Sequence, residues 1–356
     1  MKIVDIKTKV ISIKLNKTFK TALRSLDKME NIIVEILTDT GITGYGAAAP
    51  TEVITGDTKK SIIGGIEYIK KHLINKDIRN FEDIMVTLNR CIEGNTSAKA
   101  AVDIGLYDLY GKLYKAPVYK LLGGYRNKLT TDITISINSP EEMAKDSQHA
   151  VNNGFNYLKI KVGKDANMDV IRMQAIRKAV GDNVNLLIDA NQGFEPKEAV
   201  RVIRRMEESD IKINLVEQPV YAKDLEGLRY VTNNVNVPVV ADESTFSPID
   251  AMKVINMRAV DMINIKLMKT GGIYNALKLI TIAEVNDIDC MVGSMMESKI
   301  GVNAAAHFAA SRSNIVHVDL DVPLLCCEEY INGGITYNKN NIFLQAEDGF
   351  GITINN

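Results

Sequence analysis

Charged side chains recur at regular intervals in the second half of the chain, each at the end of a short apolar run. These residues are Lys159, Lys161, Asp189, Glu217, Asp242 and Lys266. From Lys161 onward they are separated by about 24–28 residues, which is about the length of one strand and one helix in an alternating β/α chain. Because the carboxyl ends of parallel strands meet at one edge, we expect these side chains to form a single site.

The three acids predict a metal site. Three carboxylates that lie close together repel one another strongly unless a cation lies among them. Hard oxygen ligands that leave room for water or substrate suit Mg²⁺. We therefore predict that Asp189, Glu217 and Asp242 bind a Mg²⁺ ion.

The lysines predict proton transfer. Lys159 and Lys161 are two residues apart and share one face of a strand, so each ammonium group, together with a nearby metal, is expected to lower the pKa of the other. A lysine whose pKa approaches neutrality can accept a proton. Lys266 ends the sixth predicted strand, which lies opposite the second in a closed barrel of eight strands. One lysine would then face each side of a substrate held on the metal.

This layout suits chemistry at a carbon next to a carboxylate. Removal of a weakly acidic α-hydrogen leaves an enediolate, whose charge a divalent ion and neighbouring cations stabilise. Two active lysines on opposite faces would permit racemisation or epimerisation. One active lysine, with the other serving only as a cation, would fit β-elimination or cycloisomerisation instead.

Alternating strands and helices must position these residues. The predicted strands lie near residues 132–137, 157–162, 185–189, 214–217, 238–242, 262–266, 289–293 and 314–319. The helices between them begin with signals such as Ser139-Pro140-Glu141-Glu142, which has a capping-box spacing with proline in the first turn. No Gly-x-Gly-x-x-Gly follows any strand, so the pattern favours a closed parallel barrel over a dinucleotide-binding sheet.

The residues before the predicted barrel show a different pattern of apolar and polar residues. Residues 4–14 alternate, residues 31–37 form a second β-branched run, and the polar stretch 17–30 between them is predicted as a loop. Helical spacing follows, and strands followed by helices suggest an α+β unit. We predict an α+β domain over residues 1–125, to which the tail from about residue 322 to 356 returns, and a barrel over residues 126–321.

Composition narrows the partners and the compartment. The chain of 356 residues has 43 Lys and Arg against 44 Asp and Glu, a net charge of −1, which disfavours nucleic-acid binding. No run of about 18 apolar residues or signal-peptide pattern occurs, so no membrane segment is expected. The four cysteines have neither zinc nor disulfide spacing, and free thiols in the cytoplasm are expected.

The Lys-x-Lys pair, the Asp/Glu/Asp series and the later lysine resemble the enolase superfamily, in particular its muconate-lactonizing-enzyme subgroup. Further motifs that carry the resemblance are Ala100-Ala101-Val102-Asp103, Leu121-Leu122-Gly123-Gly124, Asp189-Ala190-Asn191-Gln192 and Ile265-Lys266-Leu267. The resemblance implies an α/β fold: a modified (β/α)7β TIM-type barrel with the α+β unit as its capping domain. It also implies Lys161 and Lys266 as the acid and base, one Mg²⁺ ion per subunit and a homo-oligomer.

Within the subgroup, the chain resembles dipeptide epimerases that act on L-Ala-D/L-Glu. In that family, residues at the positions of Asp319 and Asp321 bind the ammonium group of the dipeptide, and Arg24 could hold a substrate carboxylate in a bidentate manner. Further substrate neighbours that the resemblance implies are Thr134, Lys159, Ser294, Met296 and Glu297. Residues 54–57 would form a lid. Ala47 stands where the family often has glutamate.

The resemblance thus implies epimerisation of a small dipeptide, with a role in murein-peptide metabolism. One alternative keeps the site but changes the reaction to that of o-succinylbenzoate synthase or muconate cycloisomerase. Those substrates lack an ammonium group, so Asp319 and Asp321 would have no group of the substrate to bind. A Schiff-base aldolase that uses one lysine and a non-catalytic ligand-binding barrel are two further alternatives.

Overall fold

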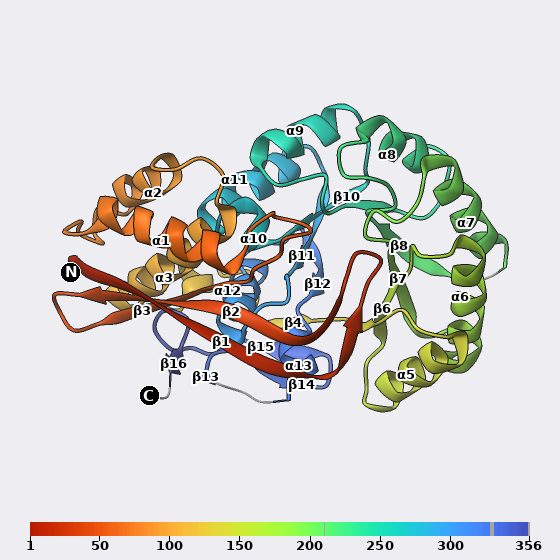
Figure 1. The fold of residues 1–356 in the computed structure, drawn as a ribbon, viewed down its shortest axis with the longest axis horizontal. Coiled ribbons are helices and arrows are strands. Elements are labelled where there is room, and N and C mark those ends of the chain that lie inside the picture. The colour runs from red at the N-terminus through yellow and green to blue at the C-terminus, as the bar shows by residue number, and fades with distance from the viewer. Residues whose placement is uncertain (210, 328–330, 355–356) are drawn as a thin grey trace.

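The computed structural model describes residues 1–209, 211–327 and 331–354. Figure 1 shows a long antiparallel sheet with helices at one end of the molecule and a ring of strands and helices at the other. The N-terminal elements are β1 (Ile3–Lys20), β2 (Ser25–Thr38), β3 (Thr43–Ala48), α1 (Lys59–Leu73), α2 (Phe81–Arg90), α3 (Thr96–Tyr114) and α4 (Val118–Leu121).

The sheet β1-β2-β3 packs directly onto α3, which is buried around almost its whole circumference. Small residues permit this contact. A Cβ atom at Gly46 would collide with the backbone of Ala101 and Gly105, and one at Gly44 would collide with Gly105 and Leu109. Glycine is therefore required at both positions of β3, because only a residue without a side chain allows the strand and the helix to approach so closely.

The predicted loop over residues 17–30 is wrong for most of its length. β1 and β2 continue as a two-stranded ribbon beyond the sheet, and the chain turns only between Thr21 and Arg24, where Thr21 N donates to Arg24 O at 3.0 Å. In Figure 1 this ribbon reaches across to the barrel. Both of its faces are largely exposed, so its residues are polar and lack the alternation that marks a half-buried strand.

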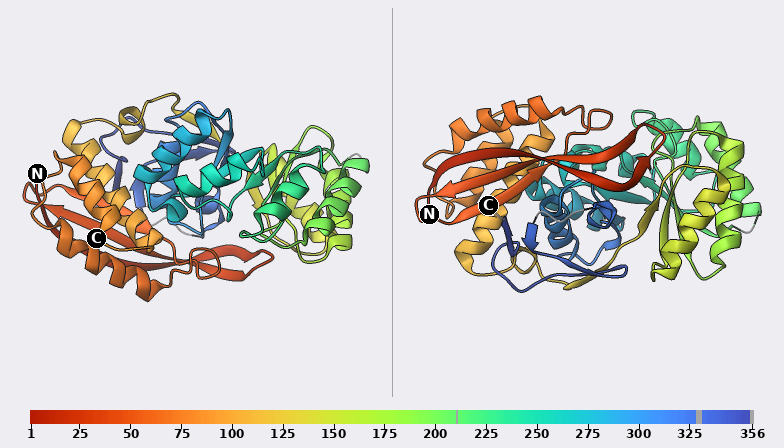
Figure 2. Two further views of the ribbon diagram at one scale, coloured as in Figure 1. Left: turned by 90° about the horizontal axis from the view of Figure 1, so that it is seen from above. Right: turned by 60° about the horizontal axis from the view of Figure 1, so that its bottom comes forward.

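Eight strands form the barrel that the sequence predicts, each within a few residues of its expected position. They are β5 (Ile133–Ile135), β6 (Tyr157–Lys161), β7 (Asn185–Asp189), β8 (Ile213–Glu217), β9 (Val239–Ala241), β10 (Met262–Ile265), β11 (Asp289–Gly293) and β12 (Ile315–Asp319). They pair in chain order, and every pair is parallel. Helices cover the outside of this sheet, as the two views in Figure 2 show.

The barrel helices alternate with the strands, and some of them begin at a side-chain cap. They are α5 (Pro140–Asn152), α6 (Ala166–Val180), α7 (Pro196–Glu208), α8 (Leu225–Thr232), α9 (Pro248–Asn256), α10 (Leu267–Thr270), α11 (Ile273–Glu284) and α12 (Lys299–Ala309). Ser139 Oγ accepts a hydrogen bond from Glu142 N before α5, and Ser247 Oγ accepts one from Asp250 N before α9. These caps satisfy backbone donors that the first helical turn leaves free.

The first and last strands of the barrel meet at a seam. Asp132 N donates to Val318 O at 3.2 Å, and Leu320 N donates to Thr131 Oγ1 at 2.9 Å. We refer to residues 131–134 and 318–321 as the barrel seam. The seam brings the start of the barrel against its end, so the sheet is nearly closed and its interior is shared by all eight strands.

The C-terminal tail contacts both parts of the molecule. Its elements, with the short strand that precedes the barrel, are β4 (Lys128–Thr130), α13 (Val322–Leu325), β13 (Ile331–Gly333), β14 (Thr336–Asn338), β15 (Asn341–Phe343) and β16 (Ile352–Ile354). β15 pairs with β4, while Val118 N donates to Gly349 O at 2.9 Å. No helix in the described part of the chain is long and apolar enough to cross a bilayer.

Candidate active site

The inward face of the barrel strands carries the predicted acids directly above an apolar layer. That layer is a separate buried cluster of Leu187, Leu215, Val240 and Met262. Asp189, Glu217 and Asp242 each follow one of these residues by two positions and therefore point to the same side of the strand. The pairing of the strands aligns Lys161 with Asp189, and Asp189 with Glu217. Strand period and register together bring the acids to one end of the barrel.

Lys159 lies at the centre of a buried network of ion pairs. Its Nζ atom is 2.6 Å from Asp319 Oδ2 and 2.7 Å from Glu217 Oε2. The same nitrogen lies 3.1 Å from Asp189 Oδ2. The side chain is 1% exposed and does not line the cavity described below. Lys159 therefore links acids from three strands from beneath the cavity.

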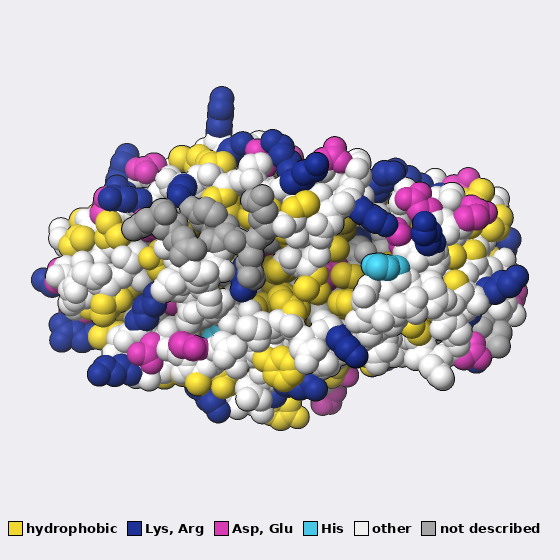
Figure 3. Space-filling model, turned by 90° about the horizontal axis from the view of Figure 1, so that it is seen from below, with side chains coloured by type: hydrophobic (Ala, Val, Ile, Leu, Met, Phe, Trp, Pro, Cys, Tyr) yellow, Lys and Arg dark blue, Asp and Glu magenta, His cyan; other side chains and the backbone are white. Residues whose placement is uncertain are grey.

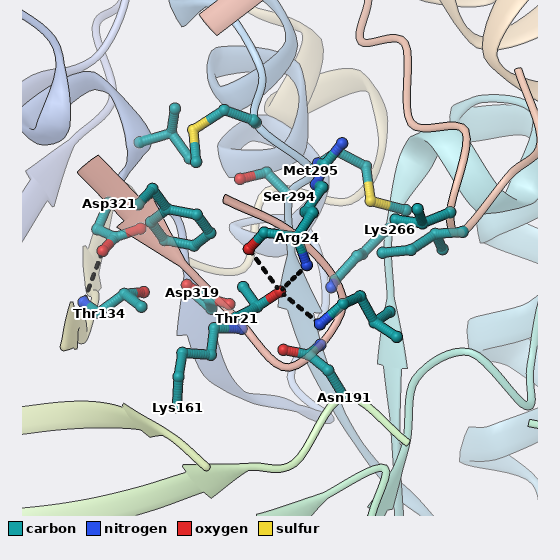
Figure 4. A pocket seen from close by; sticks show the side chains of 16 residues that line it. Thr21, Arg24, Thr134, Lys161, Asn191, Lys266, Ser294, Met295, Asp319 and Asp321 are labelled. Carbon is teal, nitrogen blue, oxygen red and sulfur yellow. Dashed lines mark hydrogen bonds between the residues drawn. The ribbon is translucent and has the colours of Figure 1, made fainter. Parts of the chain in front are cut away.

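Lys161 and Lys266 come from opposite strands of the barrel and line the same cavity. Lys161 Nζ is 2.6 Å from Asp189 Oδ2, and Lys266 Nζ is 2.7 Å from Asp242 Oδ2. Each lysine therefore pairs with a different predicted metal ligand. The view in Figure 4 shows the two side chains entering the pocket from separate strands.

The expected lowering of the lysine pKa is wrong for Lys159, and Lys266, for which no lowering was predicted, also has a raised pKa. Burial lowers the pKa of Lys266, but the Asp242 and Glu217 carboxylates outweigh it and hold that pKa above its ordinary value. The pKa of Lys159 is likewise raised, with Asp319 as its strongest carboxylate neighbour. The prediction considered the neighbouring ammonium group, whereas the carboxylates at ion-pair distance have the larger effect.

The acids suit a divalent cation chemically, although lysines lie between them. Burial, followed by the nearby Asp189 carboxylate, raises the pKa of Glu217. Carboxylate oxygens are the donors that Mg²⁺ prefers. As the side chains stand, no three Asp, Glu, His or Cys residues among those described are arranged to hold a metal. Binding through Asp189, Glu217 and Asp242 would require the lysine contacts to rearrange.

The cavity lies between the β1–β2 turn and the carboxyl ends of the barrel strands, and Figure 4 shows it from close by. The predicted residues that line it are Arg24, Thr134, Lys161, Lys266, Ser294, Met296, Asp319 and Asp321. Ile54, from the predicted lid, also lines it. Ala47 is buried within β3, where it pairs with Ile33, and does not reach this cavity. Residues far apart in the sequence thus form one pocket.

The β1–β2 turn holds Arg24 over the cavity. Thr21 Oγ1 accepts hydrogen bonds from Leu23 N at 3.1 Å and Arg24 N at 3.2 Å, which fixes the turn. Burial lowers the pKa of Arg24, and the distant Glu52 only partly opposes this effect. Within the described residues, no carboxylate lies within ion-pair distance of the Arg24 guanidinium. A partly buried cation of this kind favours an anionic group of a ligand.

Asp319 and Asp321 lie at the end of β12, to the left of Arg24 in the view of Figure 4. Asp321 Oδ2 accepts a hydrogen bond from Thr134 N at 2.7 Å. Burial, followed by the Asp319 carboxylate, raises the pKa of Asp321 to about 6. The cavity therefore has an acidic end and a basic end, an arrangement that suits a ligand with a cation at one end and an anion at the other.

Glu297 does not lie where a wall of the pocket was expected. It is 2% exposed and lies behind the loop that carries Ser294 and Met296, with its Oε1 accepting from Met295 N at 2.8 Å. Burial raises its pKa to about 7. Glu297 supports the pocket wall from behind instead of lining it.

Two further residues belong to the site but were not predicted. Asn191 lines the cavity, and its Nδ2 atom is 3.4 Å from both Asp189 Oδ2 and Glu243 Oε1. Lys269 is fully buried, with Nζ 2.6 Å from Asp242 Oδ1. The spacing of Asn191 from Asp189 could have revealed its inward position. Lys269 lies on the short helix α10, so only the folded chain shows that it returns to Asp242.

Two family models match the chain. The model described as "Mandelate racemase / muconate lactonizing enzyme, N-terminal domain" matches residues 5–123, and that described as "Enolase C-terminal domain-like" matches residues 142–356. Fold and site thus define a barrel isomerase of the enolase type. The chain belongs to the mandelate racemase/muconate lactonizing enzyme family of the enolase superfamily.

Individual relatives are similar over their whole length. The L-Ala-D/L-Glu epimerase of Clostridium acetobutylicum is 57% identical over 358 residues, with 100% of both chains covered. A substrate-liganded structure of the L-Ala-D/L-Glu epimerase from Bacillus subtilis has a TM-score of 0.98 at 49% identity and 99% coverage of both chains. A dipeptide epimerase from Enterococcus faecalis, complexed with Mg and L-Leu-L-Tyr, has a TM-score of 0.96 at 42% identity, covering 99% of this chain and 100% of its own.

These similarities make the chain an isomerase. They set aside the Schiff-base aldolase and the non-catalytic barrel. The geometry of this chain bears on its substrate and on the roles of its individual residues.

Proposed function

We propose that the chain is a Mg²⁺-dependent dipeptide epimerase that moves a proton at the α-carbon of the C-terminal residue of L-Ala-D/L-Glu. The observation that carries this proposal is the position of Lys161 and Lys266, which enter one cavity from opposite strands. A carbon atom held between them can lose a proton to one amine and gain a proton from the other. The proton count of the enzyme is restored when the two lysines re-equilibrate with solvent.

The protein groups divide the work of this reaction. A neutral amine on one lysine takes the α-proton, and the ammonium group of the other gives a proton to the opposite face. Mg²⁺ bound by Asp189, Glu217 and Asp242 would supply Lewis-acid stabilisation of the enediolate charge on the substrate carboxylate. Lys159, which is held between three acids, keeps a positive charge beneath the site and does not exchange roles with Lys161.

The two ends of the cavity match the two ends of the substrate. Asp319 and Asp321 would bind the ammonium group of the dipeptide, with Thr134 holding Asp321 in place. Arg24 would bind the γ-carboxylate of glutamate at the second position. Ser294 and Met296 form the wall between these ends. An o-succinylbenzoate synthase or muconate cycloisomerase substrate would leave the acidic end without a cation to bind.

Exchange of the α-hydrogen with D₂O tests the proposal. We expect L-Ala-L-Glu to incorporate deuterium and to form L-Ala-D-Glu in the presence of Mg²⁺. Exchange should be lost in Lys161→Ala and in Lys266→Ala, and it should persist in Lys253→Ala, whose side chain is 58% exposed on α9. Full exchange in either active-site variant would refute the mechanism. Turnover of a succinylbenzoate precursor in place of the dipeptide would refute the substrate.

Further properties are part of the same proposal. We propose one Mg²⁺ ion per subunit, a cytoplasmic location, a role in murein-peptide metabolism and assembly into a homo-oligomer. Apolar side chains gather near the middle of the face shown in Figure 3, and such a patch can serve as an interface between copies.

We also propose residues 1–125, with the tail over 322–356, as the capping domain, and residues 126–321 as the catalytic domain. The hydrogen bond between Val118 and Gly349 supports this division.

A further inference from the structure

Asp132 is a buried carboxylate on the barrel seam that the proposed reaction does not use. Its residue is 2% exposed, and neither carboxylate oxygen has a hydrogen-bond partner when both are treated as acceptors. A charged carboxylate left in this state would be strongly destabilising. The position of Asp132 therefore requires a partner or a proton.

The seam shows which partner is available. Asp132 N donates to Val318 O, so the side chain of Asp132 stands beside Asp319, the next residue of β12. Lys159 interacts with both acids; its Nζ lies 2.6 Å from Asp319 and also contacts two other acids. Two neighbouring carboxylates with one shared cation do not both remain charged; one takes up a proton.

We propose that Asp132 is a positioning residue, which donates its carboxyl O–H to Asp319 and so fixes the orientation of the proposed ammonium-binding carboxylate. The inference rests on the proposed function, because it takes Asp319 as the ligand of the substrate's ammonium group. It extends a pattern already visible at the seam. Thr134 N donates to Asp321 at 2.7 Å (Figure 4), so residues 131–134 already supply a donor to one of the two acids, and Asp132 would supply one to the other.

The charges around the two acids agree with a protonated Asp132 and a charged Asp319. Burial, followed by the Asp319 carboxylate, raises the pKa of Asp132 well above its ordinary value. Burial also raises the pKa of Asp319, but Lys159 and Lys161 outweigh it and lower that pKa overall. The proton thus belongs on Asp132 and the charge on Asp319, which is the state that binds a cation.

A polar cavity gives Asp132 access to protons from the far side of the barrel. Asp132 lines it together with Asn156, Tyr157, His317 and Asn340, at the end of the barrel remote from the active site. Asp132 does not line the active-site cavity. It therefore acts on the substrate through Asp319 and does not touch the substrate itself.

Two substitutions at Asp132 test whether its side chain acts as a hydrogen-bond donor or as a charge. Asp132→Asn keeps an N–H donor in the place of the O–H, so we expect kcat/KM for L-Ala-L-Glu to stay within about threefold of wild type. Asp132→Leu removes the donor, and we expect KM to rise by about tenfold or more with a smaller change in kcat, because a hydrogen bond to a charged group is lost. Equal losses in both variants, or no loss in either, would overturn the inference.

A spectroscopic measurement tests the same inference without substrate. Wild type at neutral pH should show an infrared carbonyl band of a protonated carboxyl group that is missing in Asp132→Asn. Asp182→Asn, at an exposed position, should leave that band unchanged. An unaltered band in Asp132→Asn would show that Asp132 carries no proton and would overturn the inference, even if Asp132→Leu fails to fold. If wild type instead fails to epimerise any dipeptide, the proposed function fails while the infrared result still stands.

Discussion

Asn31 on β2 and Met296 on the loop after β11 are joined by a buried hydrogen bond, in which Asn31 Nδ2 donates to Met296 O at 2.9 Å. The Oδ1 atom of the same asparagine accepts from Ser298 N at 2.7 Å. Asn31 is fully buried. One side chain of the N-terminal sheet thus fastens the loop that forms a wall of the candidate active site, which links the position of the cap to the shape of the pocket.

Replacement of Asn31 by alanine should loosen this wall. Two buried backbone groups would lose their partner, each at a cost of about 1–3 kcal/mol. We expect a lower free energy of unfolding and a higher KM for the dipeptide, measured by urea denaturation and by steady-state kinetics. Asn286→Ala, at an exposed asparagine in the turn after α11, is the matched control. An Asn31→Ala variant with unchanged stability and KM would show that the loop holds its shape without the cap.

Arg24 should set the preference for an acidic residue at the second position. Loss of a charge-assisted hydrogen bond costs about 1.5–3 kcal/mol, so Arg24→Ala should lower kcat/KM for L-Ala-L-Glu by about 10–100-fold. The same change should have little effect on a dipeptide with a neutral second residue. Kinetics on the two dipeptides measure this difference. Arg201→Ala, at a largely exposed arginine on α7, should affect neither, and an equal loss on both dipeptides would contradict the assignment.

Removal of the metal should abolish activity reversibly. We expect EDTA to stop deuterium exchange and added Mg²⁺ to restore it. Glu217→Gln should weaken Mg²⁺ binding by more than about 100-fold, because loss of a residue behind a metal ligand already costs about 10–100-fold. Titration calorimetry with Mg²⁺ measures this directly. Glu226→Gln, an exposed change on α8, should bind Mg²⁺ as wild type does. Undiminished Mg²⁺ affinity in Glu217→Gln would remove this residue from the site.

His307 should make stability fall in acid. Its ring is buried between Tyr119 and Phe350, and its Nδ1 atom accepts from Tyr119 N at 3.2 Å. Burial lowers the pKa of His307 from 6.5 to about 3. Between these values the unfolded chain binds a proton that the folded chain does not, so stability is lost as the pH falls from about 6.5 to about 3 and is independent of this group above that window.

The variant His307→Asn keeps an acceptor near Tyr119 but cannot take up the proton. We therefore expect its free energy of unfolding to depend less on pH in that window, by an amount on the order of a few kcal/mol. Urea denaturation at a series of pH values provides the measurement. His72→Asn, at an exposed histidine on α1, should keep the wild-type slope, and an identical slope in His307→Asn would rule out the buried histidine as its source.

The sequence by itself determined the barrel and the position of the acids within it. The two-residue period of a strand places Asp189 above Leu187 and Glu217 above Leu215, and the constant spacing of the strand ends brings them to one level. Both features follow from the local geometry of each strand and helix, which the residues of that segment determine.

Only the tertiary structure decided how the charges are partnered. The prediction of a lowered pKa for Lys159 was wrong because its Nζ atom lies 2.6 Å from Asp319, a contact between two strands far apart in the sequence. The burial of Glu297 and the position of Asp132 beside Asp319 also depend on the folded chain. The polar ribbon of β1 and β2 also escaped prediction, because its strands are exposed on both faces. Contacts between segments far apart in the chain depend on how the barrel closes and where the cap lies, and they decide which groups are charged, which are neutral and which can reach a substrate.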